Sequence, residues 1–170
     1  LFRSLEKGGV LVYSPGEIIV HPLHGAGRIE EIVEQKVAGE IRKYYVLQIP
    51  TDHVRVMVPV DGCEHIGIRP AVTAEEARDI LAAFAKIEVE PEPNWNRRYR
   101  ENMLRLKSGK LEEVSRVVKS LMVRDAEHKL STGERKMLAT ARRILLSELV
   151  LATDEPYEAL ERALEAGLSL

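Results

Sequence analysis

The chain has 170 residues, of which 45% are hydrophobic and 31% are charged, a composition typical of a globular protein with one or two small domains. No run of about 18 apolar residues is present, so we expect neither a transmembrane helix nor a membrane partner. The single cysteine, Cys63, excludes an internal disulfide, and the N-terminus lacks the apolar stretch of a secretory signal. We therefore expect a reducing, cytoplasmic setting.

Charge is distributed unevenly along the chain, although the net charge is only −2. Residues 95–149 contain fourteen Lys and Arg against seven Asp and Glu, a net charge of +7. Residues 14–70, 71–94 and 150–170 carry net charges of −2, −4 and −4. A basic block between acidic flanks favours a contact with nucleic acid that is confined to that block.

Residues 14–70 have the pattern of short β-strands. We expect strands over 17–21, 28–37, 44–49 and 54–59, with a glycine-rich turn over 24–27 and a hairpin turn at Ala38-Gly39. Pro59, Gly62 and Gly67 mark the end of this region. Several short strands within about fifty residues predict a small, strongly bent sheet of the Tudor or SH3-like type.

From residue 73 the apolar residues recur at helical spacing. Thr73 and Glu76 form a capping box, and the helix that they open should run to about Lys86. Residues 88–93 contain two prolines and three glutamates, which predicts a stiff, solvated connector. We therefore treat 71–93 as a helix plus connector, with the domain boundary in the connector or just before the helix.

Residues 94–170 are predicted to be entirely helical. Asn94 can cap a helix to about Lys107, and Ser131 with Glu134 forms a capping box for a helix to about Ala152. Between these two helices we expect another helix with one apolar stripe, and a short acidic helix should follow Pro156. The inward positions of the three helices are Leu111, Val114, Val118, Leu121, Leu138, Ala141, Leu145, Leu149, Tyr157, Leu160, Leu164 and Leu168. The expected fold class is α+β, with a bundle of three to four helices after the sheet.

Catalytic signatures are missing from the chain: it has no P-loop, no dinucleotide-binding glycine fingerprint and no nucleophile elbow. Cys63 near His65 leaves a catalytic thiol as an alternative, but nothing supplies a third group. His21, His24, Cys63 and His65 are spaced unlike any standard structural zinc site. We predict no enzyme, no metal and no cofactor.

The basic block opens with Trp95, the only tryptophan, followed by Arg97, Arg98, Tyr99 and Arg100. Cations in the first turn of a helix oppose the helix dipole, which suggests a role outside the helix, such as binding phosphate. The aromatic ring could stack on a base or wedge into a groove. The alternative is that Trp95 and Tyr99, four residues apart, both belong to the helical core.

The chain resembles the CarD/CdnL family of bacterial transcription regulators over roughly residues 14–152. In the first half the resemblance is carried by Pro15-Gly16-Glu17, Val20, Pro22, His24-Gly25, Tyr45-Val46-Leu47 and Val56-Met57-Val58-Pro59. In the second half it is carried by Pro93-Asn94-Trp95, Arg97-Arg98-Tyr99, Leu130-Ser131, Gly133-Glu134, Met137-Leu138, Ala141-Arg142 and Ile144-Leu145. Residues 1–13 lie outside it, as an N-terminal extension or an added remnant.

The resemblance implies a division of labour. Residues 14–70 would be a Tudor-like domain that binds the β subunit of bacterial RNA polymerase, and residues 94–170 a basic domain that contacts promoter DNA in the minor groove and along the backbone at the upstream edge of the bubble. The polymerase-binding residues would be Gln35, Lys36, Val37, Arg55 and Met57. The DNA-binding residues would be Trp95, as the wedge, with Arg97, Arg98, Tyr99, Arg100, Arg135, Lys136 and Arg142. Gln35 and Met57 stand where some relatives have arginines.

The alternative function is a polymerase-binding module whose DNA contact is incidental, since the transcription-repair coupling factor carries a similar N-terminal module. Nothing in the sequence requires a dimer, so we expect a monomer.

Overall fold

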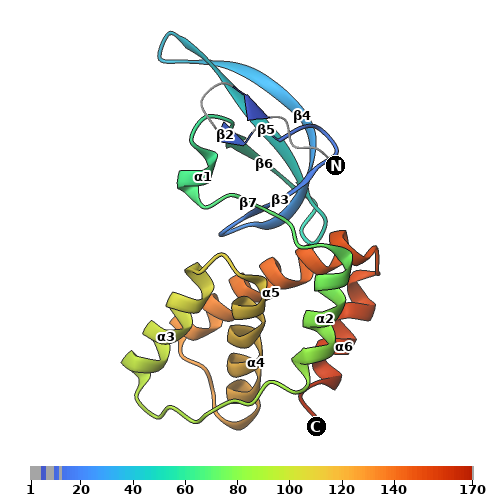
Figure 1. Ribbon diagram of the computed structural model, residues 1–170. Coiled ribbons are helices and arrows are strands. Elements are labelled where there is room, and N and C mark those ends of the chain that lie inside the picture. Colours follow the sequence, from blue (N-terminus) through green and yellow to red (C-terminus); the bar gives the residue numbers. More distant parts are fainter. Residues whose placement is uncertain (1–4, 7–9, 12, 170) are drawn as a thin grey trace.

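A computed structural model describes residues 5–6, 10–11 and 13–169 of the chain (Figure 1). An antiparallel sheet occupies one end of the molecule, and helices occupy the other. The α+β class is therefore confirmed. Two-residue strands β1 (Leu5–Glu6) and β2 (Val10–Leu11) pair with each other within the expected N-terminal extension, and Tyr13, its last residue, is buried in the core of the sheet domain. Residues 1–4, 7–9 and 12 of the extension lie outside the described residues.

The sheet has the strand order β6-β5-β4-β3-β7. Its strands are β3 (Ile18–His21), β4 (Gly25–Val37), β5 (Glu40–Ile49), β6 (Val54–Pro59) and β7 (Arg69–Pro70). The four predicted strands are confirmed, but β7 and the one-turn helix α1 (Cys63–Ile66) are too short to produce a periodic pattern. The buried apolar core of the sheet domain consists of Tyr13, Ile19, Ile29, Tyr45, Leu47, Ile49, Val58, Cys63 and Ile68.

The predicted glycine turn over 24–27 is wrong, because Gly25 and Gly27 lie within β4 and the turn occupies residues 22–24. A Cβ on Gly25 would lie 2.3 Å from Ser147 Oγ, and one on Gly27 would lie 2.9 Å from Ile49 Cδ1. Gly27 therefore allows close approach within a strand, whereas Gly25, which directly follows the turn with a φ of 89°, also makes room for α5.

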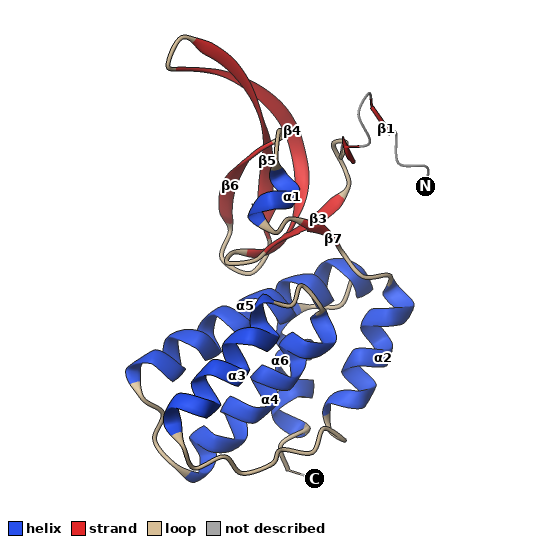
Figure 2. Ribbon diagram, turned by 60° about the vertical axis from the view of Figure 1, so that its left-hand side comes forward, coloured by secondary structure: helices blue, strands red, loops and turns tan. Residues whose placement is uncertain are grey.

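The β4–β5 hairpin projects beyond the rest of the sheet and away from the helices (Figure 2). Strand β3 pairs only with residues 25–28 of β4, and β6 pairs only with residues 44–49 of β5. The outer half of the hairpin therefore presents unpaired backbone on both edges. Its two turn residues, Ala38 and Gly39, have φ angles of 50° and 85°, which is the geometry of a type I′ turn.

Five helices form the second domain within the described part of the chain: α2 (Ala74–Phe84), α3 (Trp95–Lys107), α4 (Leu111–Glu127), α5 (Thr132–Thr153) and α6 (Tyr157–Ala166). The capping boxes at Thr73 and Ser131 and the Asn94 cap are confirmed. Phe84 of α2 is buried in the helical core, so the bundle exceeds the three to four helices expected. Most predicted inward positions are buried, while Leu138, Tyr157 and Leu168 are partly exposed.

Candidate functional site

Trp95 is the first residue of α3, and its side chain is 42% exposed. The indole stacks on Tyr99, with 5.0 Å between ring centroids and 20° between planes. Its Nε1 donates a hydrogen bond to Ser131 Oγ at 3.0 Å. The core alternative for Trp95 is therefore wrong, because only Tyr99 of this pair packs on the helical core.

The first turn of α5 supplies the seat for this aromatic pair. Ser131 Oγ accepts hydrogen bonds from both the Trp95 indole and the Glu134 backbone N–H. A Cβ on Gly133 would lie 3.3 Å from Tyr99 Cε2 and 3.8 Å from Trp95 Cζ2. Sequence reasoning assigned Ser131 only to helix capping and missed this second role. A glycine in the first turn of a helix, where it weakens the helix, was the available signal.

Arg98 is buried, with 7% of its surface exposed, although we predicted that it contacts DNA. Its Nε donates to Glu134 Oε1 at 2.6 Å, and its Nη1 donates to the carbonyl of Glu92 at 2.8 Å. Burial alone would raise the pKa of Glu134, but the hydrogen bonds from Arg98 and Ser131 lower it below its usual value. Arg98 is corrected to a structural role that joins α3, α5 and the connector.

The remaining cations predicted to bind DNA differ in their exposure and in whether they already have a partner within the protein. Arg100 and Lys136 are exposed and have no partner among the described residues. Arg97 is exposed and lies 3.5 Å from the Glu92 carboxylate. Arg135 is exposed and donates to the Leu130 carbonyl. Arg142 is bound more firmly, because it donates to Glu161 of α6 at 2.9 Å and is only partly exposed.

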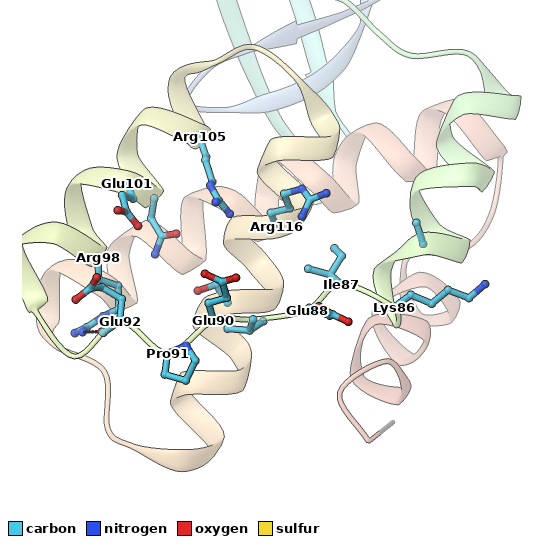
Figure 3. Close-up of a pocket in the computed structure, with 14 residues that line it drawn as sticks. Lys86, Ile87, Glu88, Glu90, Pro91, Glu92, Arg98, Glu101, Arg105 and Arg116 are labelled. Atoms are coloured by element: carbon cyan, nitrogen blue, oxygen red, sulfur yellow. Dashed lines mark hydrogen bonds between the residues drawn. The ribbon is translucent and has the colours of Figure 1, made fainter.

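A cavity of about 680 Å³ separates the connector from α3 and α4, and Arg98 lies at one end of it (Figure 3). Figure 3 shows Glu90 of the connector and Arg105 of α3 pointing toward each other across it. Arg116 on the α4 wall is already engaged by Glu112 and Glu113. Arg98 therefore ties the C-terminal end of the connector to α3 and α5.

Three of the predicted polymerase-binding residues gather at the outer face of the sheet. Gln35 Nε2 lies 3.9 Å from Met57 Sδ, and Arg55 binds Glu30 at 2.6 Å. A hollow of about 350 Å³ is lined by Glu31, Val33, Glu34, Gln35, Val46, Arg55 and Met57. Lys36 and Val37 are exposed on the hairpin arm but do not line this hollow.

The histidines and the cysteine have local roles. Cys63 is buried and burial raises the pKa of its thiol, whereas the His65 side chain is 85% exposed. His21 accepts hydrogen bonds at Nδ1 from the backbone N–H groups of Leu23 and His24. Across residues 5–6, 10–11 and 13–169 there is no group of three or more His, Cys, Asp or Glu side chains that could hold a metal ion. No helix in the described part of the chain is both long and apolar enough to span a membrane.

Comparison with known families defines the class of protein. Residues 13–72 match the CarD-like/TRCF RID domain, and residues 79–165 match the CarD C-terminal domain. An RNA polymerase-interacting domain followed by a helical domain defines a transcription factor rather than an enzyme, which removes the catalytic-thiol alternative.

The chain belongs to the CarD family, as its sequence motifs predicted. It is 34% identical over 138 residues to a protein of Bacillus subtilis (strain 168) named "Putative transcription factor YdeB". That similarity covers 81% of this chain and 90% of the Bacillus protein, so it includes both domains.

Proposed function

We propose that this protein docks on the β subunit of bacterial RNA polymerase and stabilises the open promoter complex with Trp95, which acts as a minor-groove wedge at the upstream edge of the bubble. The observation that carries the proposal is the setting of Trp95. A large aromatic side chain remains 42% exposed, is tethered by a hydrogen bond to Ser131, and stands beside exposed cations. Such a ring is held ready for an external partner.

Docking would use the projecting hairpin and β6. An extended segment of a partner can add to an unpaired strand edge through main-chain hydrogen bonds. Exposed apolar side chains on these strands, among them Ile41, Val54 and Met57, could supply the contacts that give specificity. Gln35, Lys36, Val37, Arg55 and Met57 remain the residues that we assign to this contact.

DNA binding would use the first turns of α3 and α5, which Trp95 joins through Ser131. Arg97, Arg100, Arg135 and Lys136 would contact backbone phosphates, because exposed cations there release counterions on binding. Tyr99 supports the wedge from behind by stacking. Arg98 is reassigned to support this surface, and Arg142, tied to Glu161, would lie at its margin.

The wedge acts through a difference in affinity between two states of the DNA. On closed duplex it must unstack a base step, which costs a few kcal/mol, whereas at the edge of a bubble that step is already open. A ligand shifts an equilibrium only by its preference for one state. A preference of about 1.4 kcal/mol would shift the closed–open equilibrium about tenfold.

The test is permanganate footprinting of a promoter bubble with the full-length protein and the Trp95→Ala variant. We expect the variant to bind polymerase normally but to lose most of the added bubble lifetime. Leu104→Ala is the matched control, because Leu104 is a 65% exposed apolar residue on the same helix. Bubble lifetimes that are the same for wild type and Trp95→Ala would rule out the wedge.

A second candidate function is polymerase binding with incidental DNA contact. It is favoured by the domain match itself, because the RID domain is described as shared between CarD-like proteins and TRCF. Replacing both Arg97 and Arg100 with Glu discriminates the two candidates. Unchanged promoter activity in that variant would support the second candidate, and a strong reduction would support the first.

A further inference from the structure

The sheet and the helical domain are joined by buried polar contacts along the C-terminal half of α5. Ser147 is fully buried, and its Oγ accepts the backbone N–H of Ala26 in β4 at 2.8 Å. Gly25 makes this approach possible, because any Cβ there would collide with Ser147 Oγ and lie 3.0 Å from the Arg143 carbonyl. The sheet therefore sits directly on the backbone of α5.

Glu148, the next residue of α5, is also fully buried and binds the sheet domain. Its two carboxylate oxygens accept hydrogen bonds from the two terminal nitrogens of Arg69 in β7, both at 2.7 Å. Its Oε1 also accepts the backbone N–H of Val72 at 2.9 Å. A bidentate pair fixes orientation as well as distance. These contacts therefore set the angle between the two domains.

A third contact ties the sheet to the same helix. Arg143 forms a partly exposed ion pair with Asp52, in the turn between β5 and β6, with 2.8 Å between Nε and Oδ2. Val20 and Ala26 of the sheet belong to the same buried apolar cluster as Ile144 and Leu145 of α5. The interface thus combines apolar packing with three polar anchors that lie within six residues of one helix.

The opposite end of α5 seats the proposed DNA wedge, through Ser131 and Gly133. From Gly133 to Ser147 the helix spans about 21 Å at 1.5 Å per residue. We propose that α5 is a rigid spacer, and that Gly25, Arg69, Ser147 and Glu148 are positioning residues that fix where Trp95 stands relative to a sheet docked on polymerase. This inference rests on the proposed function, and it adds that the two activities depend on one fixed geometry.

The physical reason is effective concentration. If the helical domain pivoted freely on a docked sheet, Trp95 would sample a large volume and its effective concentration at the DNA would be low. A fixed joint keeps Trp95 near one place on the DNA. Loosening the joint should therefore reduce open-complex stabilisation without altering either contact surface. A role in stability alone would instead reduce all functions in proportion to the unfolded fraction.

The test loosens the joint from each side in the full-length protein. Glu148→Gln leaves the Arg69 guanidinium without its charge partner, and Arg69→Met removes the same pair from the sheet side without touching the helical core. Spin labels on cysteines placed at exposed Ile41 and Leu104 report the distance between domains, since Cys63 is buried and stays unlabelled. We expect one narrow distance in the parent and a broad distribution in both variants.

Function is measured on the same unlabelled variants. We expect at least a fivefold loss of the added open-complex lifetime, with affinity for the polymerase β subunit within about twofold of the parent. The control is Glu112→Gln, which removes the ion pair with Arg116 within α4, away from the joint and from the assigned contact residues, and should leave both distance and lifetime unchanged. A narrow distance in both joint variants, or a broad distance with full lifetime, would overturn the spacer.

The failure of this inference can be told from the failure of the proposed function. If Trp95→Ala loses the added open-complex lifetime while a variant with a loosened joint keeps it, the proposed wedge role of Trp95 is supported and the proposed spacer role of α5 is wrong. If Trp95→Ala keeps the effect, the proposed function itself is wrong. Helical circular dichroism identifies a variant that has unfolded, and in that case the variant made from the other domain decides.

Discussion

The buried pair of Arg98 and Glu134 shows how a single residue can have the sequence context of a ligand contact and a structural role. Arg98 sits in an arginine-rich run beside the only tryptophan, and that context predicted a DNA contact. Its guanidinium instead neutralises a carboxylate that is 1% exposed. Arg98 faces inward because its partner is Glu134, and a partner that lies 36 residues away leaves no local pattern in the sequence.

Replacing Arg98 with Ala should destabilise the protein by about 3 kcal/mol, because the buried Glu134 carboxylate loses its hydrogen-bonded counter-charge and keeps only Arg124, whose Nε lies 3.8 Å away. Urea denaturation would measure the loss. Arg100→Ala, an exposed change on the same helix, should stay within about 0.5 kcal/mol of the parent. Equal effects of the two substitutions would mean that Arg98 is not the structural arginine.

The titration of His21 makes the stability of the sheet domain depend on pH. Burial, with a smaller effect from the neighbouring His24, lowers the pKa of His21 from 6.5 to about 4. The neutral ring is the form that accepts the two backbone hydrogen bonds at Nδ1. Because the folded-state pKa lies below the unfolded value, this contribution to stability is present above pH 6.5 and is lost as the pH falls toward 4.

His21→Asn should flatten that part of the pH profile, because an amide oxygen can accept the turn hydrogen bonds without titrating. The measurement is the urea midpoint of the parent and the variant at several values between pH 7 and pH 4. Carboxylates titrate in both proteins, so only the difference between the two profiles reports on His21. Parallel profiles would contradict the assignment.

At the scale of elements, most of the secondary structure could be predicted from the sequence. The caps at Thr73, Asn94 and Ser131 are local patterns, and they placed three helix starts correctly. The glycines of β4 were misassigned because each makes room for another element: Gly25 for α5, more than a hundred residues away in sequence, and Gly27 for β5. A close approach between distant segments is visible in the sequence only as a glycine, and a turn also produces a glycine, so the sequence alone does not separate the two causes.

The tip of the β4–β5 hairpin offers a prediction at the same scale. Ala38 holds a φ of 50°, a left-handed conformation that is unfavourable for alanine and well tolerated by asparagine. Ala38→Asn should stabilise the hairpin by about 1 kcal/mol, since Asn-Gly is the preferred type I′ pair. Slower amide hydrogen exchange over residues 33–37 would measure this, and unchanged exchange would contradict it.

For the whole molecule, the sequence indicated where the two proposed surfaces lie along the chain but not how the two domains are joined. The charge map and the family motifs located both regions, and the exposure of Trp95 agrees with a contact role. The joint could not be predicted, because Arg69 and Glu148 are ordinary charged residues separated by 79 positions, and a buried pair has no local pattern.

The basic block predicts a salt dependence for the whole protein. Removing one cation that binds a phosphate should reduce the slope of log affinity against log salt by about 0.9 for duplex DNA. Arg97→Gln with Arg100→Gln should therefore lower the slope by about 2, measured on promoter duplex by anisotropy. Arg98→Gln, measured on the folded part of the sample, should leave the slope unchanged. A reduced slope for this variant would mean that Arg98 does contact DNA.

Trp95 is the sole tryptophan of the chain, so the protein's indole fluorescence comes from one known place. That place is the stack on Tyr99 beside Ser131. Emission colour and quenching by iodide should change when DNA covers or separates the ring, and should remain constant when only the distant sheet is engaged. The unmodified protein thus contains an intrinsic optical reporter at the position where its proposed action takes place.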